Sequence, residues 1–289
     1  MTPDLVLDAK AECAESPVWD AAGARLWWTD IPARQVHRFD PSTGADESFA
    51  TPGRVGCFAL ARSGGLIVAM ENGLSRLDLE TGAHELLAEP EAGRADNRFN
   101  DGRCDRRGRF LASSMHEERS VPQGALWQLD PEFGVRLLAD HVLVGNGLAF
   151  SPDNTIMYWS DSRRGRVFTF DYDIETGSAW NRQLWLETDD STGRPDGACV
   201  DADGCYWSAR FRGSRVIRFT PDGRIDREIA LPVSQVTMCA FGGADLQTLF
   251  ITSAREGLDE AALAAEPHAG GIFAVHVGVP GMAEPKFSA

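Results

Sequence analysis

The chain has 289 residues, 43% of them hydrophobic and 25% charged, with 29 Gly and 15 Pro, a composition typical of a globular protein with many turns. Its 28 Lys and Arg oppose 43 Asp and Glu, and the resulting formal charge of -15 repels nucleic-acid phosphates and anionic lipid headgroups. The N-terminus lacks a basic stretch followed by an apolar core, and no apolar run approaches the roughly 20 residues of a spanning helix, so we expect a cytoplasmic protein without nucleic-acid or membrane partners.

A pattern of short apolar segments separated by turns recurs six times along the chain. In each copy, a Gly, Asp or Asn turn precedes a strand-like segment; these segments read RLWWTD, GLIVAM, RFLASS, IMYWSD, CYWSAR and TLFITS and begin at residues 25, 65, 109, 156, 205 and 248. Another apolar run lies before each of them, and the last residues of successive runs are 41 to 50 positions apart. A period of about 45 residues with four short strands per copy is typical of the blades of a β-propeller.

The repeat therefore predicts an all-β protein, a six-bladed β-propeller that forms a single domain over residues 1–289. The sixth copy has three strands of its own, whereas the N-terminal segment DLVLDAK precedes the first copy without a neighbour. We expect this N-terminal strand to close the last blade and so to remove an exposed edge. The best helical candidate is 257–267, an Ala-rich segment that ends at Pro267.

Six cysteines are spread along the chain without a CxxC pair and with mostly apolar neighbours, which is typical of buried thiols in a reducing compartment. Cys199 and Cys205 flank the turn DADG and could face each other across a hairpin, although pairing cannot be read from spacing alone. We expect no structural disulfide.

The innermost strand of each blade lines the central channel, so equivalent positions of the six copies form a ring around the axis. One such ring contains the residue that lies five positions before the end of the first apolar run of each copy. Its members are Glu15, Gly56, Asn100, Asn146, Asp196 and Thr237. Carboxylates and amides are costly when buried without partners, whereas a hard divalent cation requires such oxygens. We predict a metal ion held by Glu15, Asn146 and Asp196, with positions left open for water and substrate.

An alternative is that the Asn and Asp residues of NDG, NGL and PDG are ordinary turn residues that satisfy backbone donors. Glu15 favours the metal interpretation, because glutamate is a poor turn residue and yet falls at the same ring position. The identity of the cation stays open, since two carboxylates and an amide suit Ca²⁺, Mg²⁺ or Mn²⁺ and could accept Zn²⁺ or Fe²⁺.

Further candidates lie in the third copy. Arg98 stands two residues before Asn100, so in an extended strand both side chains point to the same side and Arg98 could reach the channel mouth. Glu117 and Glu118 lie in the next loop, where they could close over a ligand. For each of these charged residues the alternative is a solvated surface side chain.

Other catalytic motifs are absent. The sequence contains no GxSxG elbow, Walker A loop, HExxH or GxGxxG motif, and its six histidines lack metal-ligand spacing. These absences argue against serine-nucleophile, nucleotide-binding and zinc-protease chemistry.

The chain resembles one known family over nearly its whole length, and four longer segments carry this resemblance. They are AESPVWD near the start, NRFNDGRCDRRGRFLASSM in the third copy, GNGLAFSPDNTIMYWSDS in the fourth and RPDGACVDADGCYW in the fifth. On these segments the chain resembles the regucalcin and gluconolactonase family, also called the senescence marker protein, gluconolactonase and luciferin-regenerating enzyme family. The resemblance implies a six-bladed propeller with one divalent metal in its central tunnel that hydrolyses sugar lactones to aldonic acids.

The resemblance also implies roles for single residues. The metal-binding residues of the family fall on Glu15, Asn146 and Asp196, and its substrate-binding residues fall on Arg98, Asn100 and, from an M-x-E-E segment, Glu118. The loop MHEERSVPQG departs from the regucalcin segment, which leaves the role of Glu118 and the sugar preference open. Among bacterial members the chain is most similar to the xylonolactonases.

These observations predict a sugar lactonase, a carboxylic ester hydrolase that opens an aldonolactone such as xylonolactone or gluconolactone in sugar catabolism. Asp196 is the candidate base that takes a proton from the attacking water, while the metal acts as a Lewis acid. We expect a monomer whose partner is the small lactone. Two alternatives stay open: a non-catalytic binding propeller, because LWWTD and MYWSD resemble the YWTD repeats of receptor modules, and a metal-dependent esterase or organophosphatase.

Overall fold

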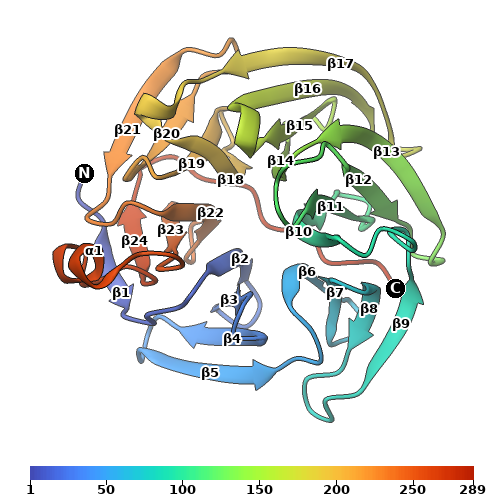
Figure 1. Ribbon diagram of the computed structural model, residues 1–289, viewed down its shortest axis with the longest axis horizontal. Coiled ribbons are helices and arrows are strands. Elements are labelled where there is room, and N and C mark those ends of the chain that lie inside the picture. The colour runs from blue at the N-terminus through green and yellow to red at the C-terminus, as the bar shows by residue number, and fades with distance from the viewer.

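The computed structural model describes residues 1–289, except for the side chain of Asp190. Six sheets of four strands each stand in a ring around a central axis (Figure 1). In the first five sheets the strands follow one another outward from the axis in chain order, so each blade is built from one stretch of chain. The predicted all-β, six-bladed propeller is confirmed.

The strands have the following bounds. The first three blades are β2 (Ala14–Asp20), β3 (Arg25–Asp30), β4 (Gln35–Asp40) and β5 (Ala45–Ala50); β6 (Val55–Leu60), β7 (Leu66–Met70), β8 (Gly73–Leu77) and β9 (His84–Ala88); and β10 (Asn97–Cys104), β11 (Phe110–His116), β12 (Gly124–Leu129) and β13 (Val135–Val142). The last three are β14 (Gly145–Phe150), β15 (Ile156–Asp161), β16 (Arg166–Asp173) and β17 (Ser178–Glu187); β18 (Arg194–Val200), β19 (Tyr206–Phe211), β20 (Arg215–Phe219) and β21 (Ile225–Ala230); and β22 (Val236–Gly242), β23 (Thr248–Ser253) and β24 (Ile272–His276) with β1 (Asp4–Leu7).

The N-terminal strand closes the sixth blade, as predicted. β1 pairs antiparallel with β24, with Asp4 opposite Ala274 and Leu5 opposite Phe273. It is the outermost strand of its sheet, whose order is β1-β24-β23-β22. Because this blade joins the two ends of the chain, its pairing holds the ring shut.

Burial falls from the axis to the rim of each blade. The inner strands β6 and β22 are buried at every position, whereas the outer strand β5, with the sequence ADESFA, is mostly exposed. Second strands supply the largest buried side chains, including Trp28, Trp159 and Trp207. Their indole N–H groups donate to Asp46, Ser113 and Asp201 respectively. These three tryptophans of the repeat are therefore core positions whose polar atoms have partners.

Helical structure is confined to short segments between strands. α1 (Glu260–Ala265) lies in the loop between β23 and β24, inside the predicted range of 257–267, and begins after Asp259, whose side chain accepts a hydrogen bond from the N–H of Ala262. Two 3-10 turns, η1 (Ser162–Arg164) and η2 (Asp190–Thr192), precede β16 and β18. None of the described helices is long and apolar enough to cross a membrane.

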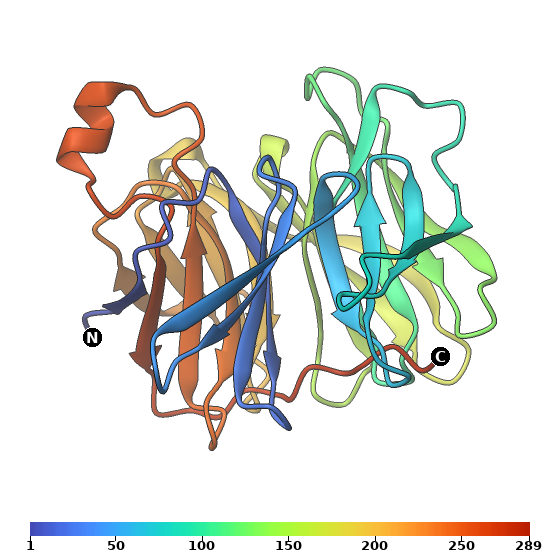
Figure 2. The same cartoon turned by 90° about the horizontal axis from the view of Figure 1, so that it is seen from below.

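The C-terminal segment, residues 277–289, crosses the face of the ring opposite α1 (Figure 2). Gly281 forms a bridge with Asp201 after β18, and Phe287 forms a parallel bridge with Ala61 after β6. Phe287 is fully buried and packs into the apolar cluster between the second and third blades. This segment, the C-terminal strap, ties the fifth blade to the second and third.

Truncating Phe287 to alanine is expected to lower the free energy of unfolding by about 3–5 kcal/mol, because it leaves a cavity where a fully buried ring lay. Phe133 stacks on Phe287, with ring centroids 6.3 Å apart, but is 38% exposed. Phe133→Ala is therefore the control, with an expected loss of at most about 1.5 kcal/mol. Chemical denaturation of both variants tests this difference, and equal losses would show that the strap does not hold the blades together.

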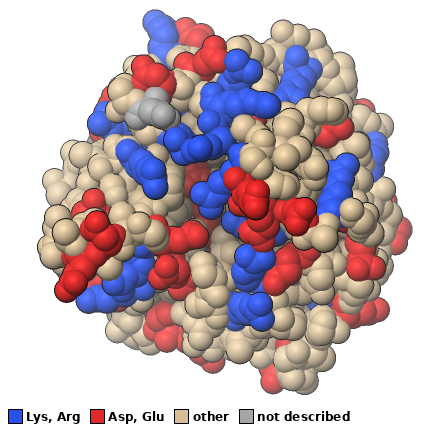
Figure 3. All heavy atoms as spheres, viewed as in Figure 1, with Lys and Arg blue, Asp and Glu red and all other residues tan. Residues whose placement is uncertain are grey.

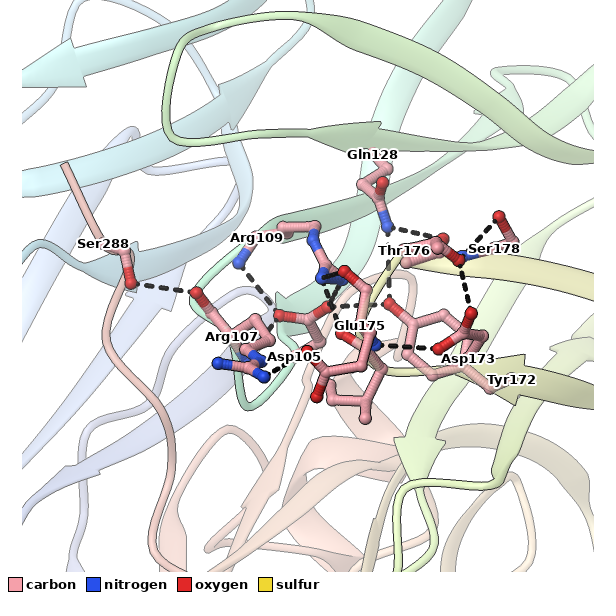
Figure 4. A network of polar contacts seen from close by, with 12 residues as sticks. Asp105, Arg107, Arg109, Gln128, Tyr172, Asp173, Glu175, Thr176, Ser178 and Ser288 are labelled. Carbon is pink, nitrogen blue, oxygen red and sulfur yellow. Dashed lines mark hydrogen bonds and ion pairs between the residues drawn. The ribbon is translucent and has the colours of Figure 1, made fainter.

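A polar network on the strap side joins the third blade to the fourth (Figure 4). Asp105, which follows β10, accepts a 2.7 Å hydrogen bond from Arg109 and another of 2.7 Å from the hydroxyl of Tyr172 in β16. Burial raises the pKa of Tyr172, and the neighbouring Asp105 charge adds to the effect, so the phenol stays a donor. The hydroxyl of Ser288 in the strap donates to the carbonyl oxygen of Arg107 at 3.0 Å. The network thus fastens two blades and the strap to one another.

All six cysteines are free thiols, as expected. The sulfur of Cys199 lies 3.6 Å from that of Cys239 on the neighbouring inner strand, and not against Cys205 across the hairpin. Burial raises the pKa of the Cys199 thiol well above its ordinary value, so this thiol is a protonated packing group.

Candidate active site

Each of the six inner strands carries a register shift, or β-bulge, beside the ring position identified from the repeat. In β2 the shift falls between Glu15 and Val18; the equivalent shifts fall at Val55/Cys57, Phe99/Gly102, Asn146/Ala149, Pro195/Ala198 and Val236/Cys239. A bulge takes a residue out of the ladder and re-aims its side chain. The same local distortion is thus repeated around the axis where the candidate ligands stand.

A cavity opens around the axis on the face that carries α1 and η1. Its lining includes five of the residues singled out from the sequence, Glu15, Arg98, Asn100, Asn146 and Asp196, and also the ring residue Thr237. The ring position Gly56 serves another purpose, because a Cβ there would lie 2.4 Å from the carbonyl oxygen of Phe99. Glycine at this position lets β6 approach β10 closely.

Glu15 and Asp196 place two carboxylates at the buried end of the cavity, with 8% and 9% of their surface exposed. Burial raises the pKa of Glu15 well above its usual range, and the charge of Asp196 adds to this effect. Burial likewise raises the pKa of Asp196; the charge of Asp101 adds to the rise, and that of Arg119 opposes it. Buried acids this close together favour protonation, and a cation between them would reverse that preference.

Asn146 links Asp196 to Ser162 through its side-chain amide. Its Nδ2 donates to Asp196 Oδ1 at 2.5 Å and to Ser162 Oγ at 2.9 Å. Its Oδ1 is buried and has no hydrogen-bond partner. Because the amide nitrogen is fully used, the amide oxygen is left as an unused acceptor in the same cavity as Glu15 and Asp196.

The three side chains fit a divalent cation. They offer carboxylate and amide oxygens, which hard cations prefer. The unpartnered oxygen of Asn146 and the raised pKa values of Glu15 and Asp196 are each what a bound cation would compensate. Among the described residues, no group of three or more His, Cys, Asp and Glu side chains is placed to hold a metal. The candidate set therefore depends on the amide for its third ligand.

Arg98 and Asn100 form a pair on the cavity wall. Arg98 Nη1 donates to Asn100 Oδ1 at 3.0 Å, and Asn100 Nδ2 donates to the carbonyl oxygen of Gly145 at 3.1 Å. Arg98 Nε lies 3.5 Å from Glu117 Oε2. The two side chains thus lie on the same side of β10, as their spacing predicts, and are held in place by both neighbouring segments.

The structure separates the two glutamates of the next loop. Glu117 is half-buried and forms ion pairs with Arg98 and Arg54. Glu118 is exposed and does not line the cavity, and its contact with substrate stays a prediction. Glu118 lies outside the cavity because a turn follows directly after β11. In this turn Arg119 adopts a left-handed φ of 57° and lines the cavity in place of Glu118.

Sequence reasoning missed the residues at the cavity mouth, which stand on loops and at strand ends and include Ile31, Arg119, Arg163, Arg194, Phe211 and Glu256. It also missed Asp101, which is 2% exposed, accepts a 2.9 Å hydrogen bond from the N–H of Leu148 and leaves its Oδ1 without a partner. Burial raises the pKa of Asp101. Its position directly after a ring residue, in the segment NDG, was the available signal.

Comparisons with known proteins identify the family of the chain. Residues 13–255 match the SMP-30/Gluconolactonase/LRE-like region. A 6-deoxy-6-sulfogluconolactonase from Pseudomonas putida is 45% identical over 275 residues, which cover 95% of this chain and 94% of that protein. Regucalcin from Xenopus laevis is 37% identical over 292 residues, which cover 99% and 98% of the two chains.

A solved structure gives the same result. It is described as a calcium-binding protein, regucalcin, from Agrobacterium tumefaciens, and it matches with a TM-score of 0.95 at 29% sequence identity, covering 100% of this chain and 98% of its own. The family match spans most of the chain, and the relatives align with it over nearly their whole length. The chain therefore belongs to the SMP-30/Gluconolactonase/LRE-like family.

Proposed function

We propose that the protein catalyses the metal-dependent hydrolysis of a sugar lactone, an aldonolactone such as xylonolactone or gluconolactone, to the aldonic acid in sugar catabolism. Its family and the 6-deoxy-6-sulfogluconolactonase among its relatives identify the chain as a sugar lactonase. One observation carries the finer proposal: the cavity brings Glu15, Asn146 and Asp196 together beside the pair Arg98 and Asn100.

Asp196 is the proposed general base. When bound by Glu15, Asn146 and Asp196, a divalent cation supplies Lewis-acid polarisation of the ester group. The Asp196 carboxylate accepts a proton from the attacking water and returns it to the ring oxygen as the carbon–oxygen bond of the lactone breaks. The 2.5 Å hydrogen bond from Asn146 fixes the orientation of this carboxylate.

Arg98 and Asn100 are proposed to orient the substrate. Both side chains line the cavity and carry N–H groups that can donate hydrogen bonds to sugar hydroxyls and to the carbonyl oxygen of the lactone. Their mutual hydrogen bond of 3.0 Å holds them in one arrangement before the substrate enters. Such positioning lowers the entropic cost of bringing water and carbonyl carbon together.

A pH-stat assay tests the proposal. The substrates are glucono-1,5-lactone, xylonolactone and a simple aryl ester, each measured after chelation and after addition of Ca²⁺, Mg²⁺, Mn²⁺, Zn²⁺ or Fe²⁺. The P. putida relative is named for a sulfonated lactone, so that compound is included. We expect aldonolactone turnover that stops on chelation and returns with one of these cations.

Other outcomes reject parts of the proposal. Turnover that persists after complete chelation contradicts the metal dependence. Faster turnover of the aryl ester or of an organophosphate favours the esterase alternative. A protein that binds lactones but turns over none of these compounds is a non-catalytic propeller.

Replacing Arg98 by glutamine is expected to raise KM by about 10- to 100-fold with a smaller fall in kcat, since its charged hydrogen bonds bind ground state and transition state alike. Arg54→Gln is the matched control, because Arg54 pairs with the same Glu117 but does not line the cavity. Steady-state kinetics of both variants measure KM and kcat and show whether Arg98 itself binds the substrate. An equal rise of KM in the control would assign the effect to Glu117 and not to substrate binding.

A further inference from the structure

We propose that arginines at the cavity mouth form a subsite for an anionic substituent of the lactone, so that the preferred substrate carries a phosphate, sulfonate or carboxylate group away from its ester. This inference rests on the proposed lactonase function and names its substrate class. The subsite, here called the arginine rim, consists of Arg119, Arg163 and Arg194.

The arginine rim is assembled from three successive blades. Arg119 lies in the loop after β11, Arg163 lies in η1 after β15, and Arg194 begins β18; all three line the cavity. The whole chain carries a formal charge of -15, which by itself repels anions. Figure 3 shows basic side chains gathered near the middle of the cavity face, among scattered acidic ones. The mouth thus carries three basic side chains although the chain as a whole is strongly acidic.

The side chains of two members of the rim have no hydrogen-bond or ion-pair partner in the described structure. Within the described residues, neither the Arg119 nor the Arg163 side chain forms a hydrogen bond or an ion pair. Other arginines of the protein are engaged: Arg98 pairs with Glu117, and Arg218 pairs with three aspartates. The guanidinium groups of Arg119 and Arg163 therefore keep all their donors for a ligand.

The acidic residues of the cavity do not cancel the rim. Besides Glu15 and Asp196 at the buried end, Glu256 is the acidic residue that the cavity lining contains within the described chain. At the mouth, Arg119 and Arg163 therefore outnumber this one glutamate even when Arg194 is not counted. A guanidinium binds oxyanions with paired, charge-assisted hydrogen bonds, so this excess suits an anionic group on a small ligand.

The rim and the two carboxylates of the buried end line one cavity. Arg163 follows Ser162, whose hydroxyl accepts the 2.9 Å hydrogen bond from Asn146. The loop before Arg194 is fixed by the fully buried Arg210, which donates to the carbonyl oxygens of Gly193 and Thr192. One lactone can therefore place its ester against the carboxylates and its substituent against the rim.

The direct test compares lactones that differ only at the position farthest from the ester. The substrates are glucono-1,5-lactone, its 6-phosphate, its 6-deoxy-6-sulfo form and the lactone of the corresponding dicarboxylic acid, and the three charged compounds distinguish phosphate, sulfonate and carboxylate. We expect kcat/KM to be at least about 10-fold higher for one of the charged lactones than for gluconolactone.

Variants of the rim arginines test whether the preference for charged lactones arises at the rim. Arg119→Gly suits the left-handed φ of 57° at this position, so the fold should be kept, and Arg163→Gln changes an exposed side chain. Each is expected to lower the ratio of charged to neutral kcat/KM by about 10-fold. Arg224→Gln is the charge-matched control, because Arg224 is exposed in the turn between β20 and β21 and does not line the cavity.

Binding provides a readout independent of turnover. Calorimetric titration with 6-phosphogluconate and with gluconate should show tighter binding of the charged acid, and this difference should shrink in Arg119→Gly and Arg163→Gln. Equal kcat/KM for charged and neutral lactones, or a ratio unchanged in both variants, overturns the subsite while leaving the lactonase proposal intact. Absence of turnover for every lactone would instead reject the proposed function itself.

Discussion

Replacing Asp196 by asparagine is expected to lower kcat for lactone hydrolysis by about 10²- to 10⁴-fold, because an amide cannot accept the proton of the attacking water. Asparagine keeps the size of the side chain and an oxygen that can accept the 2.5 Å hydrogen bond from Asn146. The loss would therefore report on the base and not on the shape of the cavity. Asp196→Ala removes the ligand oxygen as well and should abolish tight metal binding together with turnover.

Asp101→Asn is the matched control for this experiment. Asp101 is also a carboxylate on an inner strand and is 2% exposed, but it holds the N–H of Leu148 and does not line the cavity. We expect kcat in this variant to stay within about 10-fold of the unmodified enzyme. Steady-state rates and a metal titration of each purified variant provide the measurement. Full activity in Asp196→Asn, or an equal loss in Asp101→Asn, would reject Asp196 as the base.

The repeat made much of the fold and the buried end of the site predictable. Each inner strand carries its bulge beside the ring position, so counting back from the turn that follows the strand finds an equivalent position in every blade. This count brings Glu15, Asn146 and Asp196 into one cavity although they are far apart in the sequence. Strand periodicity likewise placed Arg98 and Asn100 on one side of β10.

The cavity mouth could not be predicted in this way, because most of its residues stand on loops that differ from blade to blade. Glu118 illustrates the limit: alternation stops where β11 ends at His116, and the turn that follows brings Arg119 to the cavity instead. Arg163 lies in a 3-10 turn that has no equivalent in the strand pattern. The C-terminal strap was also missed, since Phe287 is a single aromatic residue in a segment without periodicity.

Removing divalent cations is expected to destabilise the protein at neutral pH and much less at acidic pH. Burial raises the pKa values of Glu15 and Asp196 in the metal-free fold above those of the unfolded chain. Such groups contribute stability that is fully present below the unfolded pKa, about 4, and is lost as pH rises through the folded pKa. A cation binds the ionised pair and restores this loss, so its effect on stability grows with pH.

Thermal unfolding with and without EDTA, at pH 5 and pH 7.5, measures this effect. A cation present at about 1,000 times its dissociation constant adds about 4 kcal/mol, which corresponds to a rise in Tm of roughly 5–10 °C at pH 7.5. The rise should be clearly smaller at pH 5, where protons compete for the carboxylates. A rise of the same size at both pH values would place the cation elsewhere.

Glu15→Gln tests whether the cation stabilises the protein by binding at the predicted site and not elsewhere on the surface. The substitution keeps the size of the side chain and removes one of two mutually repelling buried charges, so the metal-free variant should be more stable than the metal-free parent at pH 7.5. Added cation should no longer raise its Tm, because one of the two carboxylate ligands has gone. A variant that is stabilised as much as the parent by added cation would show that Glu15 is not a ligand. One that is less stable without metal would show that the Glu15 charge is already compensated inside the protein.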